Sequence, residues 1–199
     1  WQAGAVAVMV DPDSESRADF RPHVLVDGRM RKVPPDLGRD AAPLVIGLGP
    51  GFTAGENCHA VVETNRGPYL GRVLWQGTAQ EDTGIPEGVG GRAAERVLRA
   101  PVQGVLEASV QIGDRVRAGS VTAHVGGVAI VAPFDGVIRG MAQPGIVVNA
   151  GEKVGDLDPR SDPRLCWLVS DKALAVGGGV LEAILSFAPL RLVLWGAGA

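Results

Sequence analysis

The chain has 199 residues, 46% of them hydrophobic, which allows one or two domains and a real core. Its net charge of −3 excludes the basic footprint of a nucleic-acid-binding protein. The 29 glycines and the low aromatic content of 5% favour short strands and tight turns over long helices.

The first half of the chain contains three apolar, β-rich runs. They lie at Ala5–Val10, His23–Val26 and Leu44–Leu48, and each predicts a strand. The third run is continuously apolar, as in strands that are buried on both faces. Between the second and third runs, residues 29–41 are charged and contain proline, which predicts a surface loop.

A hairpin and a linker follow these strands. Alternating polar and apolar residues over 59–75 predict two antiparallel strands that turn at residues 65–68. Residues 80–91 are polar and rich in glycine, and we interpret them as a linker to the second half of the chain.

The C-terminal part carries the signals of one helix. Ser170 is a suitable N-cap with an acidic residue directly after it, and the helix is expected to run to about Phe187, before Pro189. Residues 191–199 resemble a strand that leads into a glycine loop.

An internal duplication occupies the stretch from Ala100 to about Asp156. The sequence APVQGVL at 100–106 returns as APFDGVI at 132–138, an offset of 32 residues, and the same offset relates Gly113 to Gly145. A unit this short cannot bury its own apolar face, so the two copies should pack on each other. The duplication therefore predicts a small β-sandwich closed at its edges.

This pattern resembles the lipoyl/biotinyl carrier fold, the barrel-sandwich hybrid, over Val97–Leu157. Carrier domains place a lysine about seven residues before the second Ala-Pro, and here that position is Val125. The lysines of the chain are Lys32, Lys153 and Lys172. Because the hairpin offers no amine, we expect neither biotin nor lipoate, and the carrier function is excluded.

The first candidate site is the glycine loop, GLGPGFTAG at Gly47–Gly55, which follows a buried strand. Glycines allow backbone N–H groups to turn inward as a nest for an anion, and the candidate binding residues are Gly47, Gly49, Gly51 and Thr53. The spacing is not G-x-G-x-x-G, because position 52 is Phe. The alternative is a tight loop that simply needs positive φ angles.

The second candidate site is the hairpin tip, with Glu63 and Arg66 as possible ligand contacts. Strand alternation would place these two side chains on opposite faces, so a solvated tip is the alternative. The histidines and cysteines have no metal-ligand or nucleophile–base spacing. We therefore name no catalytic residue and no metal ligand, and we do not expect an enzyme.

The two cysteines, Cys58 and Cys166, form no disulfide framework, so the expected location is a reducing cytoplasm. Glu182 and Pro189 interrupt the most apolar C-terminal stretch, which argues against a membrane span. No signal peptide is recognisable, and the chain does not begin with Met, so we expect a fragment of a longer protein.

Four stretches together resemble one family. They are PLVIGLGPGFTAGENCHAVVETNRGPYLGRVLWQGTAQEDTGIP at 43–86, RVLRAP at 96–101, GDLDPR at 155–160 and SDKALAVGGGVLEAIL at 170–185. The chain is similar, from Ala5 to Leu185, to the selenium-dependent molybdenum hydroxylase system proteins. This resemblance implies a bacterial-type accessory role for hydroxylases related to xanthine dehydrogenase. It also implies a molybdenum cofactor or selenium species as bound group and the hydroxylase as partner.

The predicted fold is mainly β with some α. It comprises an incomplete N-terminal α/β or β segment (1–91), a duplicated lipoyl-like β barrel-sandwich hybrid (92–160), and a C-terminal helix and tail (161–199). The predicted function is a maturation protein that binds an anionic cofactor or docks on the apo-enzyme. The alternative is a non-catalytic β-barrel interaction module without a small ligand, and a packed glycine loop would favour it. Neither nucleic acid nor membrane is expected as a partner.

Overall fold

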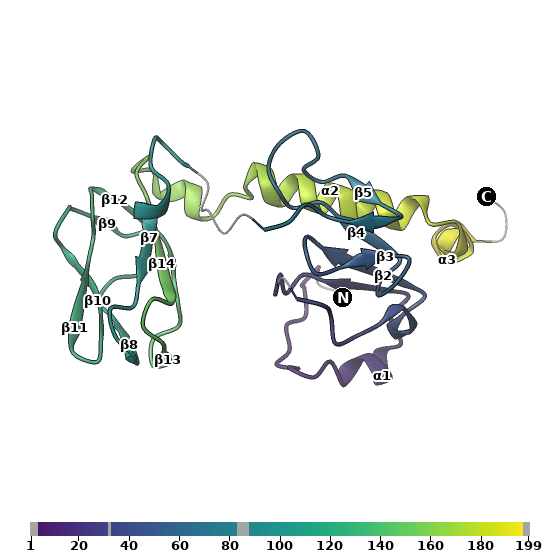
Figure 1. Cartoon of the computed structure of the whole chain (residues 1–199), viewed down its shortest axis with the longest axis horizontal. Helices are drawn as coiled ribbons and strands as arrows, with labels where there is room; N and C mark the ends of the chain where they lie inside the picture. The colour runs from purple at the N-terminus through teal and green to yellow at the C-terminus, as the bar shows by residue number, and fades with distance from the viewer. Residues whose placement is uncertain (1–3, 32, 83–87, 197–199) are drawn as a thin grey trace. The chain divides into compact units, whose positions relative to one another are not determined.

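The computed structural model describes residues 4–31, 33–82 and 88–196. The chain divides into two compact units (Figure 1). Unit 1 consists of Trp1–Asp82 and Ser170–Ala199, and unit 2 of Thr83–Val169. The three predicted domain ranges are not tested by this division and stay predictions.

Unit 1 is built on a four-stranded sheet with the order β1-β2-β4-β5. In chain order its elements are α1 (Ser16–Phe20), β1 (Val24–Asp27), the 3-10 helix η1 (Arg39–Ala41), β2 (Leu44–Leu48), β3 (Thr53–Ala54), β4 (Ala60–Val62), β5 (Val73–Leu74), β6 (Gly77–Thr78), α2 (Asp171–Ser186), the 3-10 helix η4 (Ala188–Leu190) and α3 (Arg191–Trp195). Strands β1, β2 and β4 are parallel, and β5 is antiparallel to β4. The short strands β3 and β6 pair with each other.

Strand β2 is the centre of unit 1 and is buried on both faces, as its continuous apolar run predicts. Leu44 and Ile46 belong to the core cluster that α2 shares. Val45 lies in the opposite cluster, together with Phe52 and Cys58. The predicted strands at 23–26 and 44–48 and the hairpin formed by β4 and β5 are confirmed.

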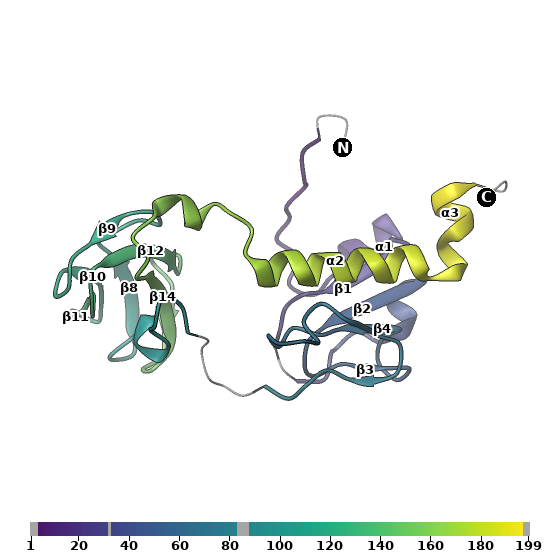
Figure 2. The same ribbon diagram turned by 90° about the horizontal axis from the view of Figure 1, so that it is seen from above.

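Helix α2 packs along this sheet (Figure 2). The side-chain oxygen of Ser170 accepts a hydrogen bond from the backbone N of Ala173 at 3.1 Å, which confirms the predicted N-cap. Gly179 faces the sheet, where an added Cβ would lie 2.1 Å from the carbonyl oxygen of Gly71. Glycine therefore permits the close approach of helix and sheet.

Two predicted strands are not formed. Residues 5–10 are extended but belong to no strand, and Val8 and Val10 are 92% and 100% exposed. The C-terminal stretch forms helix α3 where a strand was predicted, and residues 197–199 lie outside the described part. Residues 83–87 of the predicted linker also lie outside it.

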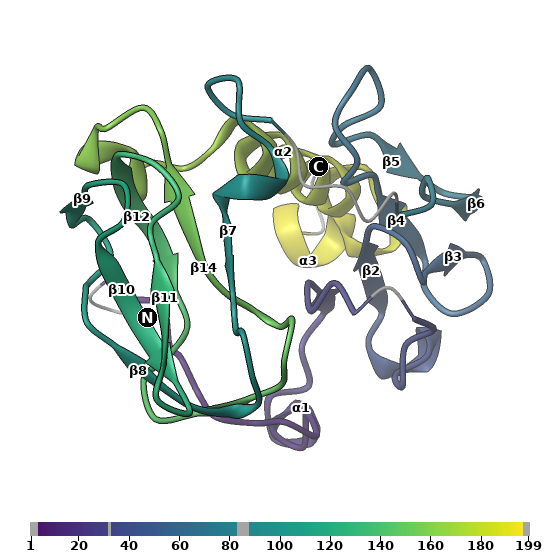
Figure 3. The same cartoon turned by 60° about the vertical axis from the view of Figure 1, so that its left-hand side comes forward.

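Unit 2 contains two antiparallel four-stranded sheets, with the orders β11-β10-β8-β13 and β7-β14-β12-β9 (Figure 3). Its elements are the 3-10 helix η2 (Ala94–Arg96), β7 (Val97–Arg99), β8 (Gly104–Ala108), β9 (Arg115–Val116), β10 (Val121–Val125), β11 (Val128–Val131), β12 (Gly136–Met141), β13 (Val147–Val148), β14 (Lys153–Asp158) and the 3-10 helix η3 (Pro163–Cys166). Both sheets contribute to one core cluster. The repeated glycines adopt matching conformations, with φ of 99° at Gly113 and 90° at Gly145.

The predicted lipoyl-like barrel-sandwich, closed at its edges, is wrong. Within the described part of unit 2 the strands stay in two separate sheets and form no closed barrel. Closure needs edge strands that pair along their length, whereas the edge strands β9 and β13 are two residues long. The molecule has several small mixed and antiparallel sheets with few helices. The alternative function, a β-barrel interaction module, is therefore also wrong, because it required a barrel.

Among the described residues, no single helix is long and apolar enough to cross a membrane. One bent pair, Pro163–Ser186 with Ala188–Trp195, meets the length and composition limits only when its two parts, inclined at 71°, are taken together. The expected cytoplasmic location stays a prediction.

Candidate functional site

The glycine loop lies at the carboxyl end of β2, and neighbouring groups pack closely on its glycines. The ring of Phe52 covers Gly47, where an added Cβ would lie 2.1 Å from the ring. An added Cβ on Gly49 would lie 2.4 Å from Oγ1 of Thr64, and one on Gly51 would lie 2.5 Å from the carbonyl oxygen of Val33. The loop is therefore packed into unit 1.

Several backbone donors of this loop are already used within the protein. The N–H of Gly49 donates to the carbonyl of Val62 at 2.9 Å, and that of Gly55 donates to the carbonyl of Cys58 at 2.9 Å. The N–H of Thr53 donates to Oδ1 of Asn57 at 2.9 Å. These three N–H groups do not point into an open nest, and ligand contact by the loop stays a prediction.

The structure does not bring Glu63 and Arg66 together. The buried carboxylate of Glu63 accepts hydrogen bonds from the backbone N–H groups of Asn65 at 2.7 Å and Gln80 at 2.8 Å. The guanidinium of Arg66 forms a bidentate pair with Asp171 in the first turn of α2. Both side chains make structural contacts, and their role as ligand contacts stays a prediction.

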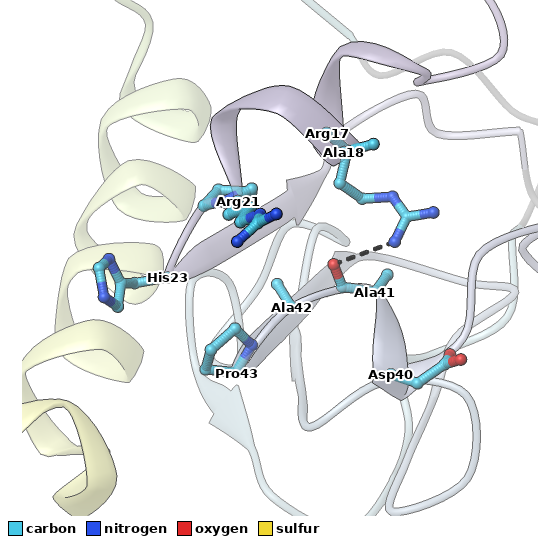
Figure 4. A pocket seen from close by; sticks show the side chains of 9 residues that line it. Arg17, Ala18, Arg21, His23, Asp40, Ala41, Ala42 and Pro43 are labelled. Carbon is cyan, nitrogen blue, oxygen red and sulfur yellow. Dashed lines mark hydrogen bonds between the residues drawn. The ribbon is translucent and has the colours of Figure 1, made fainter.

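A cavity of about 570 Å³ lies at the other end of the parallel strands. We call it the amino-end cavity, because His23 directly precedes β1 and Pro43 directly precedes β2. It is lined by Arg17, Ala18, Arg21, Pro22, His23, Asp40, Ala41, Ala42 and Pro43 (Figure 4). Ala41 and Ala42 are buried, so part of the lining is apolar. Of its charged groups, Arg17 comes from α1, Arg21 from the residue after α1 and Asp40 from η1.

The position of α1 depends on Asp11, which acts as a local cap. Its carboxylate accepts hydrogen bonds from the backbone N–H of Glu15 at 2.9 Å and from that of Ser16 at 3.2 Å. These bonds satisfy donors at the start of the helix that have no intrahelical partner. The pKa of Asp11 is lowered, first by its hydrogen bond with the Ser16 hydroxyl.

Two arginines four residues apart line the cavity, Arg17 within α1 and Arg21 directly after it. Nη1 of Arg17 donates to the carbonyl oxygen of Ala41 at 3.3 Å, which ties α1 to η1. Arg21 follows the helix in a left-handed conformation, with φ of 44° and ψ of 60°. In Figure 4 its guanidinium lies between the side chains of His23 and Arg17.

Sequence reasoning missed this set of residues. His23 is one of three scattered histidines, and Arg17 and Arg21 lie between two predicted strands, where no element is predicted. The available signal was the pair of arginines four residues apart in a short polar segment, and the structure places Arg17 in α1 and Arg21 at the C-cap of that helix. Asp40 could not be assigned, since only the pairing of β1 with β2 brings η1 beside α1.

Among the described residues of unit 1, the remaining reactive side chains do not form a second site. Burial raises the pKa of the Cys58 thiol to about 11, so it is not a thiolate at neutral pH. Nδ1 of His59 accepts a hydrogen bond from the N–H of Val45 at 3.0 Å, and burial lowers the pKa of this histidine. Within residues 4–31, 33–82 and 88–196, no three His, Cys, Asp or Glu residues are placed to hold a metal ion.

No protein-family model matches the chain. It is 46% identical over 184 residues to the uncharacterized protein YqeB of Escherichia coli K12, an alignment that covers 92% of this chain and 34% of the relative. The chain thus spans about a third of the length of the curated relative that it matches.

Solved structures give only weak likenesses. A succinylglutamate desuccinylase/aspartoacylase from Rhodobacter sphaeroides has a TM-score of 0.30 and 26% identity, over 33% of this chain and 22% of that protein. An aspartoacylase family protein from Mesorhizobium loti has a TM-score of 0.29 and 18% identity, over 43% of this chain and 27% of that protein. At these TM-scores the likeness supports no statement about fold or activity.

The expected family is contradicted by these comparisons. The relative YqeB is described as uncharacterized and not as part of a selenium-dependent molybdenum hydroxylase system, and no family model supports that resemblance. The predicted maturation role, with its molybdenum and selenium chemistry, depended on the resemblance and is therefore wrong as well.

Proposed function

We propose that this protein binds a small anionic molecule, a carboxylate or a phosphate ester, in the amino-end cavity. The observation that carries the proposal is the convergence of Arg17 and Arg21 on one cavity of about 570 Å³. Asp40 is the single carboxylate in the lining, so cationic side chains outnumber anionic ones. Arginine presents several N–H donors in a planar fork that matches carboxylate and phosphate oxygens.

The backbone of Arg21 supports this proposal. A non-glycine residue in the left-handed region is uncommon, and glycine would adopt φ of 44° at lower cost. Arg21 is the C-cap of α1, a position where the left-handed conformation is common and is usually taken by glycine. An arginine at this cap position places a guanidinium in the lining of the cavity, where glycine would place none.

The hydrogen bonding of Arg17 gives a second line of support. Its Nε is buried and has no hydrogen-bond partner among the described residues, although Nη1 is bonded to the carbonyl of Ala41. A buried donor without an acceptor costs roughly 1–3 kcal/mol. An anionic ligand with an oxygen that accepts from Nε would remove that cost.

Isothermal titration calorimetry at low ionic strength tests the proposal, with inorganic phosphate and succinate as probes. At least one probe should bind, and Arg17→Gln and Arg21→Gln should each weaken it about tenfold or more, because a charge-assisted hydrogen bond contributes roughly 1.5–3 kcal/mol. Arg117→Gln is the matched control, since Arg117 is exposed in unit 2 and the substitution changes the net charge equally.

Two results would contradict the proposal. One is the absence of measurable binding of either probe at millimolar concentration. The other is an equal loss of affinity in Arg21→Gln and Arg117→Gln, because that would indicate non-specific attraction of the anion to the positive charge of the surface.

A further inference from the structure

The segment Ala5–Val10 is an apolar run that pairs with no strand among the described residues. Val6, Val8 and Val10 are 84%, 92% and 100% exposed, and Met9 is 56% exposed. Within the described part of the chain, the backbone of residues 5–10 takes part in no hydrogen bond. Six uncharged residues with this composition have the properties of a strand that pairs with another strand.

Strand β1 offers an open edge in the same unit. It is the first strand in the order β1-β2-β4-β5 and pairs only with β2 among the described strands. Val24 packs on the α2 side of the sheet and Leu25 on the opposite side, whereas Val26 is 39% exposed. A strand added at this edge would extend both clusters and use the free backbone groups of β1.

The apolar run does not lie on the edge of its own sheet. Its carboxyl end is fixed by Asp11, which caps α1, and α1 is in turn tied to η1 through Arg17. From this fixed point the run extends away from the sheet of unit 1 (Figure 2).

We infer that Ala5–Val10 of one copy adds as a strand to the β1 edge of a second copy, and that two copies exchange these segments reciprocally. The donor strand and the acceptor edge are both present in every chain, so one two-fold axis satisfies both copies. The run carries no charge, and it would therefore bring no unpaired charge to Val26 or Leu25. The inference is independent of the proposed anion binding.

Light scattering after size-exclusion chromatography tests the assembly. The whole chain should be a dimer at tens of micromolar, and the double variant Val6→Asp/Val8→Asp should be a monomer with an unchanged circular dichroism spectrum. Leu174→Asp/Leu181→Asp is the matched control, because it places two charges on the exposed face of α2. This control should stay dimeric.

A cross-linking experiment identifies the strands that meet. In a Cys166→Ser background, a Val8→Cys chain is mixed with a Val26→Cys chain and oxidised mildly; Cys58 is fully buried and stays unreactive. A disulfide-linked heterodimer is expected, in larger yield than either homodimer.

Three outcomes would overturn the inference. The first is a parent chain that is monomeric at every concentration tested. The second is dissociation by the α2 substitutions and not by those at Val6 and Val8, which would place the interface on α2. The third is a disulfide within one monomer when Val8→Cys and Val26→Cys are combined in one chain, because the run would then pair with its own sheet.

Discussion

The carboxyl ends of β2 and β4 are covered by packed loops, whereas the amino ends of β1 and β2 open on a cavity. At the carboxyl end, Phe52, Thr64 and the backbone of Val33 occupy the space above the glycines. At the amino end, Arg17 of the short helix α1 and Arg21 directly after it line a cavity of about 570 Å³. The same three parallel strands therefore end in two different environments.

This difference shows why glycine spacing alone does not locate a binding site. Ligands of open α/β sheets usually bind beyond the carboxyl ends of the strands, and a glycine loop in that position suggests such a site. Here the glycines allow other parts of the protein to approach closely. The open, charged surface lies at the opposite end, and the following substitutions test the contrast.

The largest effect on stability is expected for Gly51→Ala, in the packed loop at the carboxyl end of β2. The new Cβ would lie 2.5 Å from the carbonyl oxygen of Val33, at φ of 101°. Because backbone strain and a backbone clash add, the free energy of unfolding should fall by roughly 2–4 kcal/mol in urea denaturation. Gly55→Ala, at φ of 93° with nothing within 4 Å, should cost only about 1 kcal/mol. Equal costs would mean that the loop is not packed.

Removal of the Glu63 carboxylate should give the next largest effect. Glu63→Ala leaves the N–H groups of Asn65 and Gln80 without their acceptor, and should lower the free energy of unfolding by about 2 kcal/mol. Glu152→Ala is the control, because Glu152 accepts from the N–H of Asn149 at an exposed turn. If Glu63→Ala is as stable as the parent, the carboxylate does not hold the hairpin tip.

Asp27, at the carboxyl end of β1, predicts a pH dependence. Hydrogen bonds from the Arg29 side chain lower the pKa of Asp27 below its ordinary value of 3.8. The contribution of the Asp27 carboxylate to the free energy of unfolding is thus fully present above about pH 5, and it is lost as the pH falls through the lowered folded-state pKa. Between pH 5 and pH 2.5, the free energy of unfolding of the parent should fall by about 1 kcal/mol more than that of Asp27→Asn, as measured by urea denaturation. Parallel pH profiles for the two proteins would rule out this linkage.

The smallest effect on stability is expected at the amino-end cavity, and there it should be an increase. Arg21→Gly relieves a left-handed backbone, and should raise the free energy of unfolding by up to about 1 kcal/mol. The same substitution should weaken binding of phosphate or succinate at least as much as Arg21→Gln does. A loss of stability in Arg21→Gly would instead indicate that the arginine side chain holds α1 in place.

Local sequence signals were sufficient for several elements. The apolar run at Leu44–Leu48 is β2, and the Ser170 N-cap begins α2 as predicted. Both predictions are confirmed because burial on two faces and helix capping depend on a few neighbouring residues. The positive φ angles of Gly49 and Gly51 also follow from the loop sequence, since other residues adopt them at a cost.

Two strand predictions failed because a strand exists only with a partner. Ala5–Val10 has the composition of a buried strand, yet no neighbouring strand pairs with it in the described chain. The tail at 191–195 is apolar enough for a strand, but it continues from η4 as helix α3. A short apolar run is compatible with a strand or with a helix, and the tertiary contacts around it determine which of the two forms.

The sequence by itself determined where the glycines, the apolar runs and the helix cap lie, because these depend on residues close together in the chain. Only the tertiary structure decided which end of the sheet is open. The parallel pairing of β1 with β2 places Arg17 and Arg21 beside Asp40 and Ala41, about twenty residues away. Because such a cavity depends on long-range contacts, no local pattern specifies it. The packing of Phe52 over Gly47 likewise depends on the folded loop.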